Sequence, residues 1–216
     1  MAPKIYGDVL SPCVRAVLIT AKALNIEIEY IPVNVIKKEQ LSAAYLEMNQ
    51  QHTVPTLDDD GIIIWDSHAI MIYLAEKYGK GNPLYPTDVA KRAKINRLLF
   101  FECGEIFSMH RYLCSELLFL GKKEISKDIA AEEEKALQFL ERFLKDSKYV
   151  AGDEMTIADF SIWTTLSNAS NMVPIKETIF PRITEWIKLM NQQPYREINE
   201  PGATRFKSLI DAALKK

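Results

Sequence analysis

Two neighbouring polar residues, Asp66 and Ser67, are the best placed in the chain to bind a charged ligand. Both are favourable N-cap residues, and an apolar run at helical spacing follows them at residues 70–74. The unpaired N–H groups and positive dipole end of a helix favour a carboxylate, while the Asp66 carboxylate can accept from an ammonium group. This combination suits a ligand with an α-amino acid head group.

The Val54-Pro55 dipeptide is a second candidate contact. Residues 53–57 and 62–65 are apolar and β-branched runs on either side of Asp58-Asp59-Asp60-Gly61, which predicts a β-hairpin. A cis bond before proline costs about 0.5–1 kcal/mol and would turn the N–H and C=O of Val54 outward, where a guest peptide can pair with them. By itself the dipeptide favours an ordinary trans proline at the start of an edge strand. The helix start beside the hairpin favours the peptide-binding interpretation instead.

The first 78 residues have the alternating pattern of an α/β layer. Strands are predicted at residues 4–7 and 28–35. A helix is predicted to start at Ser11-Pro12, because serine is a good N-cap and proline suits the first helical position. A shorter helix is predicted at residues 41–48. With the hairpin and the helix that follows it, the order is β-α-β-α-β-β-α, and its first unit is a right-handed parallel crossover.

Beyond a stretch rich in glycine and proline at residues 79–86, only helical patterns are present. Apolar periodicity predicts helices at residues 88–119, 130–144, 181–192 and 203–214. Thr156-Ile157-Ala158-Asp159 has the form of a capping box, which stabilises a helix start by about 1 kcal/mol and marks these as fold residues. We therefore expect an α/β domain at residues 1–79, a linker at residues 80–87 and an all-helical domain at residues 88–216.

The composition predicts a globular protein that binds neither nucleic acid nor membranes. The chain has 216 residues, 48% of them hydrophobic, and a formal net charge of −2, so it lacks the basic surface typical of nucleic-acid binding. No apolar run approaches the roughly 18 residues of a membrane span and no secretory signal is visible, so we expect a cytoplasmic protein. Cys13, Cys103 and Cys114 have no metal-ligand spacing, which argues against a disulfide framework or a metal site.

Taken together, these segments resemble the cytosolic glutathione S-transferases. The resemblance is carried by Ser11-Pro12-x-x-Arg15, Val54-Pro55, Asp66-Ser67-His68-Ala69-Ile70 and the Thr156 capping box, and it covers essentially the whole chain. Residues 49–55 and 66–74 are similar to the insect delta and epsilon classes, epsilon more closely. The family implies a thioredoxin-like N-terminal domain that binds glutathione as co-substrate and an all-α C-terminal domain that shapes the pocket for a small apolar electrophile. It also implies a homodimer and a role in detoxification, including insecticide resistance.

The resemblance also implies roles for individual residues, with Ser11 as the catalytic hydroxyl. The residues implied to hold glutathione are Gln40, His52, Thr53, Val54, Pro55, Asp66, Ser67, His68 and Arg111. The residues implied to line the electrophile site are Pro12, Val35, Phe107, His110, Cys114, Leu118, Phe119 and Phe206. Asp66 stands where the family usually has Glu, and Gln40 stands where many epsilon members have His. For His110 a solvated helix position is the simpler interpretation, and the apolar positions fit core packing equally well.

The implied mechanism requires ionisation of the glutathione thiol. A thiol with a pKa of about 8.5 is mostly protonated near neutrality, and lowering that pKa by two units requires about 2.7 kcal/mol. One hydrogen bond to a charged group supplies about 1.5–3 kcal/mol, so a bond from Ser11 to the sulfur, helped by the helix that starts at Pro12, is sufficient. Ser11 is then a donor and not a nucleophile, because no His-Asp pair is evident to activate it. The thiolate can add to an electrophile or remove a proton in an elimination.

Three other functions are compatible with the sequence. A thiol-transferase is one, because Cys13 lies in the first turn of a predicted helix, where the helix N-terminus lowers the pKa of a thiol. A non-catalytic carrier of apolar ligands is the second, although the intact Ser11, Val54-Pro55 and Asp66-Ser67 set argues against a loss of activity. The third is a specialised transferase in steroid hormone synthesis, known in the epsilon class, where an acidic residue is typical at the position of His110.

Overall fold

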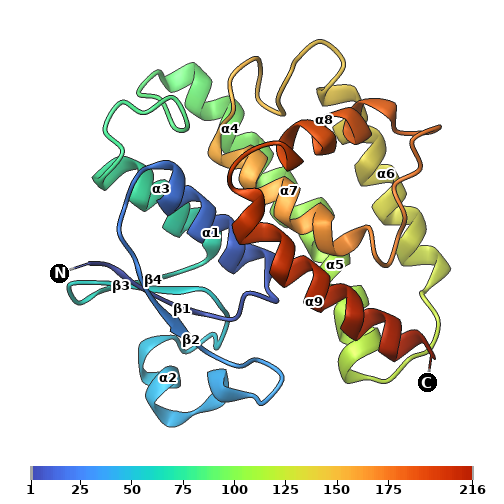
Figure 1. The fold of residues 1–216 in the computed structure, drawn as a ribbon, viewed down its shortest axis with the longest axis horizontal. Helices are drawn as coiled ribbons and strands as arrows, with labels where there is room; N and C mark the ends of the chain where they lie inside the picture. The colour runs from blue at the N-terminus through green and yellow to red at the C-terminus, as the bar shows by residue number, and fades with distance from the viewer. Residues whose placement is uncertain (1, 216) are drawn as a thin grey trace.

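A four-stranded sheet forms the first layer of the protein in the computed structural model, which describes residues 2–215 (Figure 1). The strands lie in the order β2-β1-β3-β4. β1 (Lys4–Gly7) pairs in parallel with β2 (Glu29–Pro32) and antiparallel with β3 (Thr56–Asp59), which pairs antiparallel with β4 (Ile62–Trp65). The predicted α/β layer, its parallel first unit and its hairpin are confirmed.

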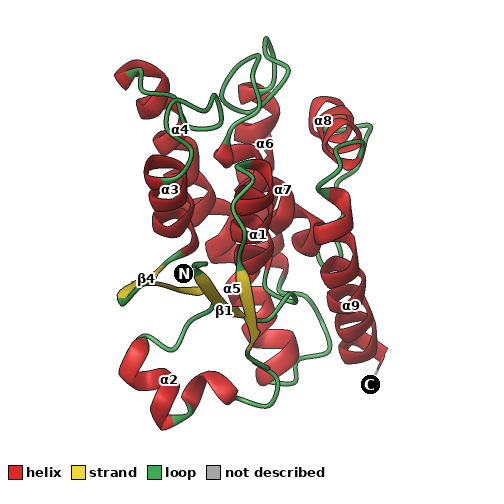
Figure 2. Ribbon diagram, turned by 60° about the vertical axis from the view of Figure 1, so that its left-hand side comes forward, coloured by secondary structure: helices red, strands yellow, loops and turns green. Residues whose placement is uncertain are grey.

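Helices cover both faces of this sheet. Figure 2 shows α2 (Ala43–Met48) on one face, and α1 (Pro12–Ala23) and α3 (Ser67–Lys77) on the other. The short 3₁₀ segment η1 (Glu39–Leu41) precedes α2. The core of this layer is made by apolar side chains of β1, α1 and α3, among them the fully buried Ile5.

The rest of the chain is helical, as predicted. Its segments are α4 (Val89–Phe101), η2 (Glu102–Ile106), α5 (Phe107–Cys114), η3 (Ser115–Phe119), α6 (Lys127–Phe143), α7 (Ile157–Ala169), α8 (Pro181–Asn191) and α9 (Arg196–Lys215). The predicted helix at residues 88–119 is continuous, but η2 and η3 are π-helical segments on either side of α5. Such segments re-aim side chains and are frequent at functional sites. The side chains of α7 are almost all buried, and α7 packs against α1 and α4.

The capping box at the start of α7 is confirmed. The Asp159 carboxylate accepts from the backbone N–H of Thr156 (2.8 Å) and from its hydroxyl (3.0 Å). Asp159 also accepts from the N–H of Val150 (3.0 Å) and from Trp186 Nε1 (3.0 Å). Burial nevertheless raises the pKa of Asp159 to about 6. Both capping residues therefore belong to the core, as expected for fold residues.

The hairpin has different bounds from those predicted. β3 begins at Thr56, after Pro55, and extends to Asp59, so the turn consists only of Asp60 and Gly61. Both turn residues have positive φ, 55° and 85°, which a two-residue hairpin turn of this kind requires. Asp59 is a strand residue because it pairs with Ile62 of β4, and its buried carboxylate accepts from Tyr73 and Lys77 of α3 and from Tyr78, which directly follows α3. β2 is shorter than the predicted 28–35, because its pairing with β1 ends at Pro32.

Helix α9 begins at Arg196 rather than at the predicted residue 203. The prediction was wrong because Pro201 and Gly202 read as a helix break, yet both lie inside the helix. Close packing of α9 against Val9 and α1 overrides the tendency of Pro201 and Gly202 to end a helix. An ideal Cβ on Gly202 would lie 2.1 Å from the carbonyl oxygen of Val9 and 2.9 Å from Arg15 Cδ, so only glycine permits this approach.

Arg15 joins α1 to the helical layer. Its guanidinium is fully buried and donates to Asn199 Oδ1 (2.8 Å) on α9 and Asn168 Oδ1 (2.7 Å) on α7. It also donates to the carbonyl oxygens of Val9 (2.7 Å) and Leu10 (3.1 Å). Burial lowers the pKa of Arg15 to about 9. These bonds hold the two layers together and fix the backbone just before Ser11.

His68 makes the second polar connection between the layers. Its Nε2 lies 2.8 Å from Glu102 Oε2 and 2.9 Å from Ser161 Oγ, and Glu102 is 1% exposed. Desolvation lowers the pKa of His68, but hydrogen bonds to Cys103 and Glu102 and the charges of Glu102 and Asp66 outweigh it and raise the pKa to about 10. His68 is therefore a cation near neutrality, and it connects α3 to the start of η2.

The close approach at Gly202 predicts a large effect of a small change. We expect Gly202→Ala to reduce the free energy of unfolding by about 1–3 kcal/mol, because the new methyl group must push α9 away from Val9. Urea unfolding of the full chain measures this. Gly104→Ala is the matched control, since a Cβ there meets nothing within 4 Å and alanine is favoured over glycine in a helix by about 0.5–1 kcal/mol. Equal effects of the two substitutions would contradict the prediction.

The raised pKa of His68 predicts a pH dependence of stability. A group whose pKa is raised by folding stabilises the folded state fully below its unfolded pKa, which is about 6.5 for histidine. This stabilisation is lost as the pH rises toward 10, the pKa of His68 in the folded protein. We expect wild type to lose on the order of 1–3 kcal/mol of its stability advantage over His68→Gln between about pH 6 and pH 9. Urea unfolding at the two pH values measures the difference. Glu102→Gln should remove the same pH dependence, and an advantage that is constant with pH would disprove the proposed pairing.

Candidate active site

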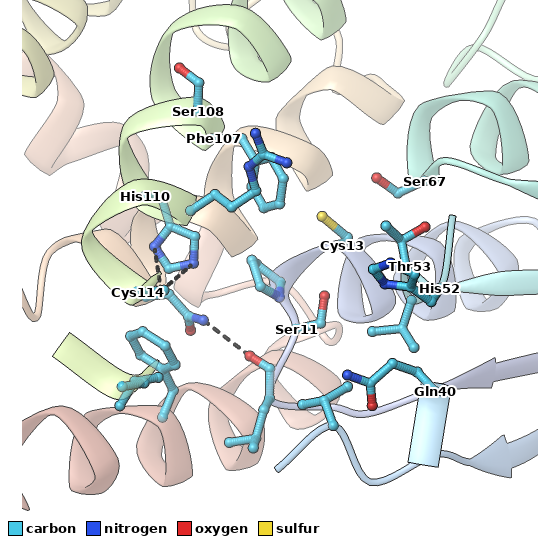
Figure 3. Close-up of a pocket in the computed structure, with 18 of the residues that line it drawn as sticks. Ser11, Cys13, Gln40, His52, Thr53, Ser67, Phe107, Ser108, His110 and Cys114 are labelled. Atoms are coloured by element: carbon cyan, nitrogen blue, oxygen red, sulfur yellow. Dashed lines mark hydrogen bonds between the residues drawn. The ribbon is translucent and has the colours of Figure 1, made fainter. Parts of the chain in front are cut away.

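A cavity of about 620 Å³ opens where the sheet layer meets α5, η3 and α9. Ser11, at the start of α1, lies near its centre (Figure 3). Gln40, His52 and Thr53 lie on one side of Ser11, and His110 and Cys114 lie on the other. The two sides differ in chemistry, because the first is made of polar loops and the second of a helix with apolar neighbours.

The fold brings together nearly all the residues implied by the resemblance. Those that line the cavity are Ser11, Pro12, Val35, Gln40, His52, Thr53, Val54, Asp66, Ser67, His68, Phe107, His110, Arg111, Cys114, Leu118, Phe119 and Phe206. Pro55 does not line it, because it is buried behind Val54. The Val54-Pro55 bond is cis and not the ordinary trans proline, while the pairing of Val54 with a guest peptide stays a prediction.

Ser11 occupies the N-cap position of α1 without acting as a side-chain cap. Its hydroxyl makes no capping hydrogen bond to the helix, which differs from the usual behaviour of serine at this position. The hydroxyl is therefore available to the cavity. The first turn of α1 also contains Pro12, which lacks an N–H group, so the helix start offers fewer backbone donors there.

Asp66 and Ser67 form the start of α3, as predicted. Asp66 Oδ1 accepts from the backbone N–H of His68 (2.9 Å) and of Ala69 (3.2 Å). Asp66 has a positive φ of 74°, a conformation that non-glycine residues adopt mainly where the surrounding structure enforces it, often at functional sites. The carboxylate is half-exposed and borders the cavity, so it can accept from a ligand as well as from its own helix.

Two further polar side chains face the same side of the cavity with unused hydrogen-bonding capacity. The side-chain oxygen of Gln40 is buried, and it has no hydrogen-bond partner among the residues described. His52 also has a positive φ, 47°, and an exposed side chain. A buried amide oxygen without a partner costs free energy that a bound ligand can recover.

His110 is not the solvated helix residue that the sequence favoured. It is 3% exposed and its ring packs between Phe107 and Phe206, with centroid distances of 5.9 and 5.4 Å. Burial, and then the charge of Arg15, lower the pKa of His110 to about 3. The imidazole is therefore neutral. The error arose because the apolar residues that cover it come from α9 and from the turn before it, not from its own exposed neighbour Arg111.

Cys13 lies beside Ser11 but does not have the activated thiol that its place in the helix suggested. Burial raises the pKa of Cys13 to about 12, and the charge of Glu102 adds to this effect. The nearby hydroxyls of Ser67 and Ser11 oppose it only in part. Desolvation thus outweighs the helix dipole, and the thiol is protonated near neutrality, which weighs against a thiol-transferase that uses Cys13.

Several lining residues were not identified from the sequence as binding residues. They are Leu10, Cys13, Ile36, Gln51, Cys103, Ser108, Asn168 and Leu209. Ile36 and Gln51 are next to implied residues, and Leu209 is one helical turn from Phe206, so proximity and helical periodicity were usable signals. Asn168 gave no signal, because it reaches the cavity only through the packing of α7 on α1, where it donates to the Leu10 carbonyl oxygen (3.1 Å).

Neither a metal-ion cluster nor a membrane-spanning helix is present in residues 2–215. No group of three or more His, Cys, Asp and Glu side chains in this range is arranged to hold a metal ion. Within the same range, no helix combines the length and the apolar character needed to cross a membrane.

Comparisons with known proteins identify the family. Residues 5–83 match the glutathione S-transferase N-terminal domain and residues 92–194 match the C-terminal domain. The chain is 37% identical to glutathione S-transferase 1 of Manduca sexta, over 99% of this chain and 100% of that protein.

Solved structures agree in sequence and in fold. An epsilon-class glutathione S-transferase from the housefly, Musca domestica, is 43% identical with a TM-score of 0.95, covering 98% of each chain. A glutathione transferase homolog from Drosophila mojavensis, solved with bound glutathione, is also 43% identical with a TM-score of 0.95, covering 98% of this chain and 97% of that one. The resemblance to the insect epsilon class is therefore confirmed. The chain belongs to the glutathione S-transferase family and is an enzyme that uses glutathione as its co-substrate.

Proposed function

We propose that this enzyme ionises the thiol of glutathione through a hydrogen bond from Ser11 and delivers the thiolate to small apolar electrophiles. The observation that carries the proposal is the Ser11 hydroxyl, which has no capping bond and borders the cavity between its polar and apolar sides. Conjugation and elimination both begin with this thiolate. The role is detoxification in the cytoplasm.

The polar side of the cavity offers contacts for each part of glutathione. The γ-glutamyl head group carries an ammonium and a carboxylate, which suit the Asp66 carboxylate and the N-terminus of α3 at Ser67. The cysteinyl backbone suits the N–H and C=O of Val54, as an added strand would. Gln40 and His52 suit the glycyl end, where the orphan oxygen of Gln40 can accept from the glycyl N–H. The remaining proposed contacts are Thr53 and Arg111, with Pro55 acting through Val54 and His68 acting through Asp66.

His68 acts in this scheme mainly by position. Its ring is already engaged with Glu102 and Ser161, and its Nδ1 lies 3.6 Å from Asp66 Oδ1. A charged His68 therefore holds the Asp66 carboxylate in place by electrostatic attraction and has no free donor for glutathione.

Ser11 and the N-terminus of α1 together can supply the free energy needed to ionise the glutathione thiol. A hydrogen bond from Ser11 to the thiolate contributes about 1.5–3 kcal/mol, and the positive end of α1 adds about 0.3–1 kcal/mol. Lowering the thiol pKa by two units requires about 2.7 kcal/mol. No further base is needed.

Removal of the Ser11 hydroxyl tests this proposal directly. We expect Ser11→Ala to raise the pKa of bound glutathione by one to two units and to lower kcat/KM about tenfold to a hundredfold near neutral pH, because the thiolate loses its donor. Titration of the near-ultraviolet thiolate absorbance of the complex measures the pKa. Ser11→Thr, which keeps a hydroxyl, is the control. If wild type and Ser11→Ala both leave the thiol protonated at neutral pH, the proposed function fails and a carrier role takes its place.

The electrophile occupies the opposite side of the cavity. The residues proposed to contact it are Pro12, Val35, Phe107, His110, Cys114, Leu118, Phe119 and Phe206. Phe206 also packs in an apolar cluster with Leu10 and Leu113, so it serves the core and the site together. Phe119 is 62% exposed and stands at the entrance.

We propose further that residues 1–79 and 88–216 are the two domains and that the active form is a homodimer. The outward side of α4 exposes Val89 by 81% and Phe100 by 75%. Apolar side chains exposed to this degree on a helix suit burial against a second copy of the chain.

Loss of this apolar surface should separate the subunits. We expect Phe100→Glu to convert the dimer to a monomer, because a carboxylate buried between subunits without a partner costs several kcal/mol. Light scattering during size-exclusion chromatography measures the mass. Ile179→Glu, at an apolar residue 46% exposed outside α4, is the control and should leave the dimer intact. A dimeric Phe100→Glu protein would place the interface elsewhere.

A further inference from the structure

Asp8 is a buried acidic residue directly after β1 that has no part in the reaction proposed above. It is 5% exposed, and each of its carboxylate oxygens accepts from a backbone N–H group, Oδ1 from Leu10 (3.1 Å) and Oδ2 from Val35 (3.2 Å). Its backbone carbonyl oxygen accepts from the N–H of Ser11 (2.9 Å). One residue therefore joins the segment that ends at Ser11 to the loop that follows β2.

The loop that follows β2 carries Gln40. The N–H of Asn34 donates to Glu39 Oε2 (2.7 Å), and the N–H of Glu39 donates to the carbonyl oxygen of Asn34 (3.1 Å). These two bonds close residues 34–39 into a compact turn, so the place of Gln40 follows from the place where Val35 is held. Gln40 and Ser11 both border the cavity (Figure 3). Their spacing therefore depends on the Asp8 carboxylate.

Arg205 on α9 is a third partner of Asp8. Its Nη1 lies 3.6 Å from Asp8 Oδ1, and 52% of its side chain is exposed. The positive charge offsets part of the cost of burying a carboxylate, although solvent screens the attraction. The Asp8 carboxylate thus lies where the start of α1, the loop after β2 and α9 meet.

We propose that Asp8 is a positioning residue for glutathione, which holds the Ser11 hydroxyl and the Gln40 amide at a fixed spacing. This inference rests on the proposed function, in which the thiol meets Ser11 and the glycyl end meets Gln40. The cysteinyl and glycyl residues are adjacent in glutathione, so the distance between their two contacts must match the ligand. A misplacement of about 1 Å can lower a rate on the order of a hundredfold. Asp8 does not line the cavity, so it acts through the backbone that it holds.

A carboxylate suits this place because both of its oxygens are acceptors, as the two N–H groups require. Asparagine is nearly equal in size, but it has one acceptor oxygen and an amide group that donates. Asp8→Asn therefore keeps one of the two bonds and places a donor against the other N–H group. The Ser11 segment and the loop after β2 are then no longer held together.

Two measurements test this role. Isothermal titration calorimetry with S-methylglutathione, which has no thiol to ionise, measures how well the site holds the peptide. Titration of the near-ultraviolet thiolate absorbance measures the pKa of bound glutathione. We expect Asp8→Asn to raise the Kd of S-methylglutathione about threefold to thirtyfold. It should also raise the pKa of bound glutathione by about half a unit to one unit, because Ser11 is no longer held against the sulfur.

Asp59→Asn is the matched control. Asp59 is also a buried carboxylate of the sheet layer, 2% exposed, but it does not line the cavity. Its substitution should lower the thermal stability and leave the Kd of S-methylglutathione within about twofold of wild type. Asp8→Ser is a second variant that removes the carboxylate without adding an amide group, and it should change the Kd and the pKa in the same direction as Asp8→Asn.

An unchanged Kd and pKa in Asp8→Asn, or changes of equal size in Asp59→Asn, would overturn the assignment. Loss of folded protein in both Asp8 variants would also overturn it, since Asp8 would then be a fold residue. If wild type leaves bound glutathione protonated near neutral pH, the proposed thiol activation fails. The Kd of S-methylglutathione does not depend on ionisation, so a failure of the proposed function and a failure of this inference give different results.

Discussion

The buried guanidinium of Arg15 is the interaction on which the geometry of the site depends. Burial of an isolated charge is costly, and it is tolerated only where each donor finds an acceptor. Here the acceptors are side-chain and backbone oxygens of α7, α9 and the Val9-Leu10 segment. The same bonds therefore join the two layers and fix the backbone that carries Ser11. Gly202 permits this arrangement, since any larger residue would meet Val9 and Arg15.

A second charged contact closes the other side of the same interface. His68 and Glu102 connect α3 to η2, and Asp66 at the start of α3 is held within reach of His68. The cavity lies between these two connections. Its shape thus follows from how the sheet layer docks on the helices, and α5, which lines it, lies between two π segments.

Desolvation determines which groups in the cavity can carry charge. Burial holds the Cys13 and Cys114 thiols protonated and the His110 imidazole neutral. In the proposed mechanism the thiol of the co-substrate differs from these, because its thiolate accepts from the Ser11 hydroxyl at the start of α1. The protein's own thiols are therefore poor nucleophiles, and the proposed reaction is left to glutathione.

The sequence by itself determined the features that depend on near neighbours: the strand and helix order, the cis-capable Val54-Pro55 bond, the N-cap at Asp66 and the capping box of Thr156 and Asp159. These follow from backbone preferences and short-range hydrogen bonds within a few residues. Family motifs added the residues that gather at one cavity, although their roles remain proposals. Tertiary structure alone decided the start of α9, the burial of His110 and the protonated state of Cys13. Each of these depends on contacts with residues far along the chain, such as Val9 with Gly202, Phe206 with His110 and Glu102 near Cys13. Such contacts exclude water from the side chains that they cover. The local sequence does not reveal this burial, because the covering residues lie elsewhere in the chain.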